Sequence, residues 1–146
     1  MQLSLQTDFG LRTLMSLAAA KRLLSVDDIA RSYGISRNHL AKVAQRLQAE
    51  GFVETFRGRG GGMRLAREPG EIVVGDVVRR LENFDSFVGC FAGGNGCAAQ
   101  NLCGLKPVLG GALEAFLAHL DRVTLADLVP DIAAFIRNLE RSAQAA

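Results

Sequence analysis

Apolar residues recur at helical spacing near the start of the chain. In the range 7–21, Leu11, Leu14 and Ala18 fall on one face, and Thr7 stands where an N-cap is expected. A helix with one apolar face needs a partner to bury it. The pattern therefore predicts a first helix that packs against the elements that follow.

Two further helices are predicted on either side of a glycine turn. Ser25 and the two carboxylates after it form an N-terminal signature, because serine caps free N–H groups and acids favour the positive end of a helix. Gly34 ends this short helix. A longer amphipathic helix begins after Ser36 and repeats its apolar residues every three or four positions until Gly51. A short helix, a tight turn and a longer helix are typical of a helix-turn-helix.

The pattern then changes to the alternation of strands. Residues 52–56 and 63–66 are predicted as two short strands, joined by a glycine-rich turn that carries Arg57 and Arg59. A basic hairpin directly after a helix-turn-helix predicts a winged helix.

The second half of the chain is predicted to be mostly helical. Residues 72–74 suggest a short extended piece, and residues 76–82 a helix. The apolar stripe over residues 105–120 is wide enough to face both its own domain and a second helix, which favours a dimerisation helix. A terminal helix is expected over residues 132–139, in a segment whose N-cap is assigned to Thr124.

We therefore predict a mainly α protein with a small β-hairpin wing. A winged helix-turn-helix domain is expected over residues 1–83, a cysteine-rich loop over 84–104, and a dimerisation helix with a C-terminal helix over 105–146. The uncharged stretch 86–105 has the length of a membrane span, but its five glycines and three amides predict a loop, so no membrane partner is expected.

Composition and charge narrow the class of protein. A chain of 146 residues with 49% hydrophobic residues is unlike a disordered protein. Three cysteines without a secretory leader argue against a disulfide scaffold and predict a cytoplasmic protein. The net charge of +2 divides unevenly: residues 1–80 hold 13 Lys and Arg against 8 Asp and Glu, and residues 81–146 hold 4 against 7. The basic half is where an anionic partner is expected.

The longer helix of the helix-turn-helix leaves a polar and basic face. Arginine can bind guanine through two hydrogen bonds, asparagine can do the same for adenine, and lysine neutralises phosphate. Glycines in the wing let the backbone approach DNA closely. The alternative is a solvated helix face and a merely flexible turn, but the order of the elements favours double-stranded promoter DNA. The predicted DNA-binding residues are Ser36, Arg37, Asn38, His39, Lys42, Arg46, Arg57, Arg59 and Arg64.

All three cysteines lie within fourteen positions of one glycine-rich segment. Cys90, Cys97 and Cys103 could converge on an iron-sulfur cluster or on zinc, both of which prefer thiolates and usually take a fourth ligand. The spacing is wider than the paired cysteines of zinc knuckles, which weakens zinc. The alternative is incidental cysteines or a redox disulfide, but inert free cysteines are usually found in apolar cores. A metal or cluster site is favoured.

With these residues assembled, the chain resembles a family of iron-sulfur winged-helix repressors, most closely its nitric oxide sensing members. The resemblance implies a homodimer whose long helices pair, a cluster held by Cys90, Cys97 and Cys103, and promoter DNA as partner with nitric oxide as the signal. A four-iron cluster (4Fe-4S) is favoured and a two-iron cluster (2Fe-2S) is the alternative. The segments that carry the resemblance, besides the cysteines, are 3–14 (LSLQTDFGLRTL), 35–47 (ISRNHLAKVAQRL), 51–65 (GFVETFRGRGGGMRL), 72–82 and 124–129 (TLADLV).

The resemblance also bears on the fourth ligand. In one branch of the family a histidine three residues after the last cysteine completes the site, but Lys106 stands there in this chain. In the nitric oxide sensing members an aspartate of the partner subunit is the implied ligand, and the matching residue is Asp8. Arg12, one turn on, and Asp85 are then expected to support the ligands. Without the family, Asp8 would be a carboxylate that favours the start of a helix.

We therefore expect a dimeric repressor that releases operator DNA when nitric oxide nitrosylates the cluster iron and the cysteine segment changes shape. An iron-sensing or redox-sensing repressor of the same family is the alternative, because the same thiolates would serve it. A small ferredoxin-like electron carrier is the alternative from another class, although it has no need of a basic winged helix. The sequence has no catalytic triad, paired acid and base or nucleotide motif, so an enzyme is not expected.

Overall fold

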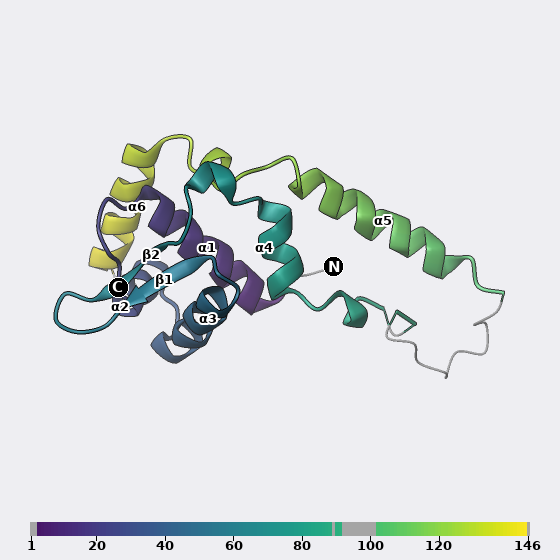
Figure 1. Ribbon diagram of the computed structural model, residues 1–146, viewed down its shortest axis with the longest axis horizontal. Helices are drawn as coiled ribbons and strands as arrows, with labels where there is room; N and C mark the ends of the chain where they lie inside the picture. The colour runs from purple at the N-terminus through teal and green to yellow at the C-terminus, as the bar shows by residue number, and fades with distance from the viewer. Residues whose placement is uncertain (1–2, 89, 92–101, 146) are drawn as a thin grey trace.

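The computed structural model describes residues 3–88, 90–91 and 102–145. These residues form a compact body and a projecting arm (Figure 1). The body contains α1 (Leu5–Ala19), α2, α3, a two-stranded hairpin, α4 and the C-terminal helix α6, and the arm is α5. The predicted class, mainly α with a small hairpin wing, is confirmed.

Helix α1 begins two residues before the predicted start. Its N-cap is Ser4, whose hydroxyl accepts a hydrogen bond from the Thr7 N–H at 3.3 Å. The prediction that Thr7 is the N-cap was therefore wrong, and the Thr7 hydroxyl instead donates to Glu82, 75 positions further along the chain. The apolar face of α1 is buried at Leu14 and Leu17.

The helix-turn-helix follows the sequence pattern closely. Helix α2 (Val26–Tyr33) starts with a capping box, in which the Ser25 hydroxyl accepts from the Asp28 N–H at 3.0 Å and the Asp28 carboxylate accepts from the Ser25 N–H at 2.9 Å. Gly34 ends it in the left-handed conformation, with φ of 62°. Helix α3 (Arg37–Ala49) then buries one face, through Leu40, Val43, Ala44 and Leu47.

The wing is an antiparallel pair of strands. Strand β1 (Val53–Phe56) pairs with β2 (Gly62–Leu65), with Val53 opposite Leu65. A third piece of backbone joins them, because Leu24 exchanges two hydrogen bonds with Met63, at 3.1 and 2.8 Å. The loop before α2 thus holds the base of the wing.

The segment after the wing pairs with the segment after the arm. Helix α4 (Val74–Leu81) starts earlier than predicted and follows a 3-10 turn over Pro69–Glu71. The extended piece predicted over residues 72–74 is present at Ile72 and Val73, where the Ile72 carbonyl accepts from the Leu125 N–H at 2.8 Å, but Val74 already belongs to α4. The Val74 N–H donates in turn to the Val123 carbonyl at 2.9 Å. A second 3-10 turn, Phe84–Ser86, leads toward the cysteines.

Helix α5 (Leu105–Leu120) matches its predicted range, and α6 (Ile132–Ala145) returns to the body. Thr124 does not cap α6, contrary to the prediction. It starts a 3-10 turn over Ala126–Leu128, and Asp131 caps α6 by accepting from the Ala134 N–H at 2.8 Å. Figure 1 shows α6 beside α1 and α2, which it contacts.

One core connects these elements. It contains the buried faces of α1, α2, α3 and α4, the base of the wing, and Leu125 from the segment after α5. Gly10 lets α1 approach α4 closely, because a Cβ there would lie 2.5 Å from the Leu81 side chain. None of the helices in the described ranges has the length and hydropathy needed to cross a bilayer.

Candidate functional site

The exposed face of α3 carries the residues predicted to contact DNA. Burial of the apolar face leaves Asn38, His39 and Lys42 exposed. Ser36 occupies the N-cap position, but its side chain makes no capping hydrogen bond, so its hydroxyl is not used by the helix. The first turns of α3 therefore present hydroxyl, amide, imidazole and ammonium groups to solvent, which are groups that bind phosphates and base edges.

Arg37, the first residue of α3, is held by a carboxylate of α2. Its Nε donates to Oδ1 of Asp27 at 2.7 Å, and both side chains are more than half exposed. The helix-turn-helix brings these residues together across the Gly34 turn. The pairing had no sequence signal beyond charge, because Asp27 reads equally well as an acid of the first turn of α2.

Arg46 faces another part of the protein. It pairs with Glu50 at 2.9 Å, and its Nη2 donates to the Arg80 carbonyl at 2.9 Å, while Arg80 itself pairs with Glu50 at 3.2 Å. These contacts join the end of α3 to the end of α4. A DNA contact of Arg46 stays a prediction, and the observed role of its side chain is to connect two helices.

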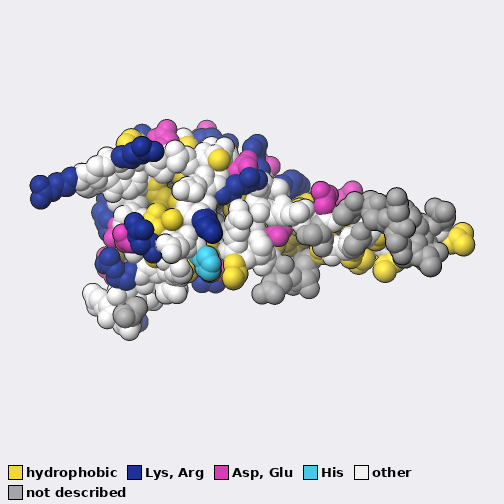
Figure 2. All heavy atoms as spheres, turned by 90° about the horizontal axis from the view of Figure 1, so that it is seen from below, with side chains coloured by type: hydrophobic (Ala, Val, Ile, Leu, Met, Phe, Trp, Pro, Cys, Tyr) yellow, Lys and Arg dark blue, Asp and Glu magenta, His cyan; other side chains and the backbone are white. Residues whose placement is uncertain are grey.

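The wing presents two arginines at its tip. Gly58 and Gly60 adopt positive φ, of 100° and 75°, and carry the backbone around the turn. Arg57 and Arg59 are exposed and have no ion-pair partner among the described residues. Arg64, on β2, instead pairs with Glu54 at 2.9 Å and lies over the Phe56 ring. Figure 2 shows Lys and Arg side chains gathered over the compact end of the molecule, up to the tip of a narrow projection.

Two of the three predicted cysteine ligands lie in the described part of the chain. Cys90 and Cys103 are both half-buried and free. Both lie in the segment between α4 and α5, and Cys97 lies outside the described residues. Lys106 is exposed in the first turn of α5. Within the described ranges, no three His, Cys, Asp or Glu side chains lie close enough together to hold a metal ion.

Asp8 and Arg12 form a pair with two contacts on α1. Nε of Arg12 donates to Oδ1 of Asp8 at 3.0 Å, and Nη2 lies 3.0 Å from Oδ2. The guanidinium also lies over the Tyr33 ring, 5.7 Å from its centroid. Burial raises the pKa of Tyr33, although its hydrogen bond with Ser16 and the nearby Arg12 oppose that effect. Arg12 is thus held in place by Asp8 and Tyr33 in this subunit.

Glu82, which has no signal in the sequence, ties the start of α1 to the end of α4. One carboxylate oxygen of Glu82 accepts hydrogen bonds from the Ser4 N–H at 2.9 Å, the Ser4 hydroxyl at 3.0 Å and the Thr7 hydroxyl at 2.7 Å. Burial raises the pKa of Glu82, but the hydrogen bonds from Thr7, Ser4 and Asn83 together lower it below its ordinary value. The start of α1, which carries Asp8, is therefore fastened to the end of α4. No local pattern could have indicated contacts over some 75 residues.

Asp85 is exposed on the 3-10 turn before the cysteines. Its backbone N–H donates to the Asn83 side chain at 3.1 Å. Its role toward a ligand stays a prediction.

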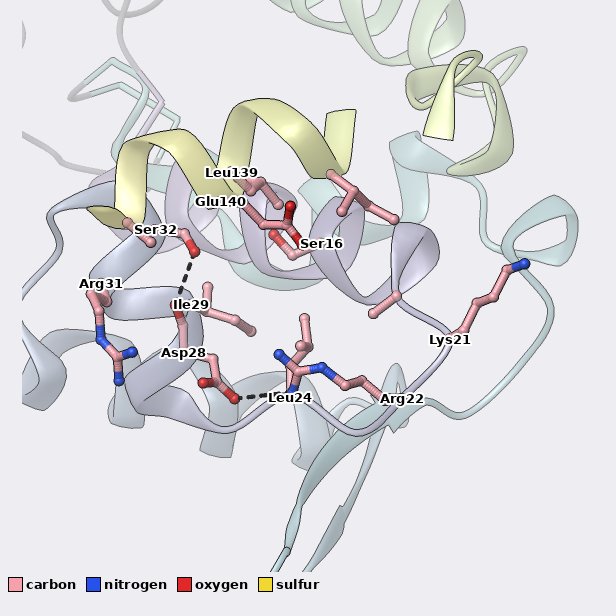
Figure 3. A pocket seen from close by; sticks show the side chains of 13 residues that line it. Ser16, Lys21, Arg22, Leu24, Asp28, Ile29, Arg31, Ser32, Leu139 and Glu140 are labelled. Carbon is pink, nitrogen blue, oxygen red and sulfur yellow. Dashed lines mark hydrogen bonds and ion pairs between the residues drawn. The ribbon is translucent and has the colours of Figure 1, made fainter. Parts of the chain in front are cut away.

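The structure also has a hollow of about 420 Å³ where α6 rests on α1 and α2. In Figure 3, Leu24 and Ile29 lie toward its middle, with Ser16 and Glu140 on the α6 side. The contacts drawn there serve the local fold: Arg22 pairs with Asp28 at 3.5 Å, and the Ser32 hydroxyl donates to the Asp28 carbonyl at 3.0 Å. The hollow lies between packed helices, and its lining includes none of the predicted DNA-binding residues or cluster ligands.

A helix-turn-helix with a basic wing defines a winged-helix DNA-binding transcriptional regulator. The model of the Rrf2 family, described as an iron-dependent transcriptional regulator, matches residues 3–131. The chain belongs to the Rrf2 family.

Individual relatives agree with this assignment. The HTH-type transcriptional regulator NsrR of Bacillus subtilis (strain 168) is 50% identical over 132 residues, which cover 88% of this chain and 90% of that protein. The NsrR of Geobacillus kaustophilus (strain HTA426) is 47% identical over 134 residues, covering 90% and 91%. The predicted family is confirmed, and its members are transcriptional regulators rather than enzymes or electron carriers.

Solved structures of the family have the same fold. T. potens IscR superposes with a TM-score of 0.71 at 28% identity, covering 90% of this chain and 88% of that chain. CymR (YrzC), the global cysteine regulator of B. subtilis, superposes with a TM-score of 0.70 at 26% identity, covering 89% and 97%.

Proposed function

We propose that this chain is a homodimeric, cytoplasmic repressor that senses nitric oxide through an iron-sulfur cluster and then releases promoter DNA. The proposal rests on one placement above all. The cysteine segment connects α4, which packs on α1 of the DNA-binding body, to the projecting α5. A change of shape in this segment is therefore well placed to move the arm relative to the DNA-binding body.

The described residues fit a cluster by their donor chemistry. Cys90 and Cys103 are free thiols, and thiolate is the preferred ligand of iron-sulfur clusters. In the proposal, Cys97 and Asp8 of the partner subunit complete the set, and a four-iron cluster is favoured over a two-iron cluster. Arg12 would then orient the Asp8 carboxylate, because it already contacts both carboxylate oxygens in this subunit.

The dimer is proposed to form through α5. Its apolar stripe is exposed in the first turn of the helix, where Leu105 is 59% and Val108 67% accessible, and Leu113 further along is buried. Large apolar side chains that stay exposed together usually mark an interface. The division into residues 1–83, 84–104 and 105–146 stays part of the proposal, with the addition that α6 packs on α1 and α2 of the DNA-binding body.

Two contacts connect the end of α4, which precedes the cysteine segment, to α1 and α3 of the DNA-binding body. Glu82 fastens the start of α1 to the end of α4, and Glu50 joins Arg80 of α4 to Arg46 of α3. When bound, an iron-sulfur cluster would supply iron that takes up nitric oxide. Cys90 and Cys103 would hold the cysteine segment to such a cluster, and a change in how they are held would pass through α4 to the end of α3. A dimer needs its two recognition helices about one helical turn of DNA apart, so a small rotation is enough to weaken binding.

The test is anaerobic DNA binding by the full chain. Freshly purified protein is analysed for iron and sulfide and by absorption spectroscopy, and its affinity for promoter duplexes is measured before and after nitric oxide. We expect nitric oxide to weaken binding, and single Ser replacements of Cys90, Cys97 and Cys103 to abolish that response. If the three variants respond to nitric oxide like the wild type, the sensor assignment is wrong.

An iron-sensing repressor is the second candidate, since the family model is described as iron-dependent. The same titration with an iron chelator distinguishes the two. If the protein released DNA when the chelator held free iron within the physiological range, and did not respond to nitric oxide, iron sensing would be favoured.

A further inference from the structure

Three of the cations predicted to read DNA are held by carboxylates, and Arg37 is the one that lies at the start of α3. Asp27 lies at the start of α2 and binds Nε of Arg37 at 2.7 Å. No ion-pair partner is found for Lys42, Arg57 or Arg59 within the described ranges. An acid on a DNA-facing surface repels phosphates, so it lowers affinity for DNA of any sequence. We therefore expect Asp27 to have a role that offsets this loss of affinity.

That role is not the capping of α2. The capping box is made by Ser25 and Asp28, which exchange both of their hydrogen bonds with each other. Asp27 is one of the two residues between them in the first turn, and its side chain is 55% exposed. Its carboxylate binds Arg37 of α3, and the capping of the N–H groups of α2 does not require it.

The pair lies where DNA is expected to pass. Asp27 and Arg37 line a hollow of about 260 Å³ together with Thr55, Phe56 and Gly58 of the wing. This hollow separates the helix-turn-helix from the wing, the two parts of the surface predicted to contact DNA. Arg37 is therefore fixed at the edge of the interface.

Asp27 binds one nitrogen of the Arg37 guanidinium, and this decides which of its N–H groups remain available to bind DNA. A guanidinium has one N–H on Nε and four on the two Nη atoms. With Nε engaged by Asp27, the two Nη atoms are left to donate together, which is the arrangement that matches O6 and N7 of a guanine. A free arginine could instead turn to a phosphate.

We propose that Asp27 is a specificity-determining residue that holds Arg37 so that its two Nη atoms read a guanine in the major groove. The inference rests on the proposed DNA-binding function and adds a residue to it. The carboxylate lowers binding to all DNA through its charge and raises discrimination at one base pair in each half-site through its hydrogen bond.

The experiment compares three variants of the full chain, Asp27→Ala, Asp27→Asn and Arg37→Ala. Duplexes with a randomised core are selected with the wild type, and affinities are then measured for the selected sequence, its single-base variants and random DNA over a range of salt concentrations. Circular dichroism confirms that each variant is folded. Glu54→Gln is the matched control, because it removes the charge of another exposed acid, 48% accessible against 55% for Asp27, that pairs with a different arginine, Arg64.

Asp27→Ala should bind random DNA more tightly, with a slope of log affinity against log salt steeper by about 0.9, because Arg37 becomes free to contact one phosphate. It should lose about five- to a hundredfold discrimination at the same guanine as Arg37→Ala. Asp27→Asn should show the increase in affinity for random DNA but keep part of the discrimination, since its amide oxygen still accepts from Nε. Glu54→Gln should leave discrimination at that guanine unchanged.

Two results separate the possible failures. If the wild type selects a defined sequence and Asp27→Ala discriminates at every position as the wild type does, the role of Asp27 is refuted and DNA recognition stands. If the wild type selects no sequence, the proposed function itself fails. If Asp27→Ala lost discrimination between bases equally at all positions, Asp27 would have a structural role, and the inference would also be overturned.

Discussion

Arg79 and Asp121 join the DNA-binding body to the base of the arm through two parallel hydrogen bonds. Nη2 of Arg79, on α4, donates to Oδ2 of Asp121 at 2.7 Å, and Nη1 donates to the other oxygen. The hydrogen bond with Arg79 lowers the pKa of Asp121. Gly75 makes room for this contact, since a Cβ there would lie 2.0 Å from Asp121 Oδ1. The joint between α4 and α5 therefore has a defined geometry.

The first prediction concerns this joint. Asp121→Ala and Gly75→Ala should both loosen it, the first by removing the acceptor and the second by displacing it. Amide hydrogen exchange over residues 117–123 should become faster in each variant, and the double variant should add little, because both changes remove one contact. Asp76→Asn is the control, since Asp76 reaches Arg79 only at 3.9 Å. Full additivity of the two changes would contradict a shared contact.

The second prediction is a pH dependence from Glu82. The folded state lowers the pKa of Glu82 from its ordinary value of 4.5. The contribution of this carboxylate to stability is therefore complete above pH 4.5 and is lost as the pH falls through the lower folded value. Glu82→Gln should reduce the free energy of unfolding by about 1–2 kcal/mol at neutral pH, because hydrogen bonds to a charged acceptor are the stronger ones.

Urea unfolding at a series of pH values checks this prediction. The difference between wild type and Glu82→Gln should be constant in the neutral range and should shrink in acid. A difference that stays the same down to the most acidic condition would show that the charge of Glu82 does not contribute.

The third prediction concerns the close approach of α1 and α4. Gly10→Ala places a Cβ 2.5 Å from Leu81 Cδ1, in a buried region where Leu81 is only 7% exposed. Overpacking of this kind costs about 1–3 kcal/mol, partly offset by up to about 1 kcal/mol of helix propensity. Gly111→Ala is the matched control, because it is also helical and has open space around it. Urea unfolding should show a loss of stability in the first variant and none in the second.

The local elements could be predicted from the sequence where local chemistry determines them. The Ser25 cap, the Gly34 turn and the glycine-rich wing follow from residues that are neighbours in sequence. The N-caps at Thr7 and Thr124 were predicted wrongly, because in each case a nearby residue has the better geometry: Ser4 accepts from the Thr7 N–H, and Asp131 accepts from the Ala134 N–H.

The connections between elements could not be predicted, because they join residues far apart in the chain. Glu82 meets Ser4 and Thr7 across nearly the whole domain, and Arg46 meets Arg80 across 34 positions. Each of these polar residues looks like an ordinary surface group in the sequence. The predicted DNA-binding residues illustrate the consequence: Lys42 is exposed as expected, whereas Arg46 is used to hold α3 against α4.

The fourth prediction tests the dimer. Val108→Glu places a charge in the first turn of α5, in the exposed part of its apolar stripe, where Val108 is 67% exposed in a single chain. The fold of one subunit should be unaffected, while association should be weakened, because the charge would be buried without a partner in a paired arm. Glu114→Lys, on another face of the same helix, is the control. Sedimentation should show monomers for Val108→Glu and dimers for the control, and dimers in both would place the interface elsewhere.

The last prediction concerns the wing. Arg57 and Arg59 are exposed at its tip, and neither has an ion-pair partner in the described part of the chain, so their replacement should leave stability unchanged. If each neutralises one phosphate, Arg57→Ala and Arg59→Ala should each weaken DNA binding at low salt and reduce the slope of log affinity against log salt by about 0.9. Arg137→Ala, which removes an exposed cation of α6, should leave the slope unaltered. Fluorescence anisotropy with labelled duplexes over a range of salt measures all three, and an unchanged slope in both wing variants would remove the wing from the DNA interface.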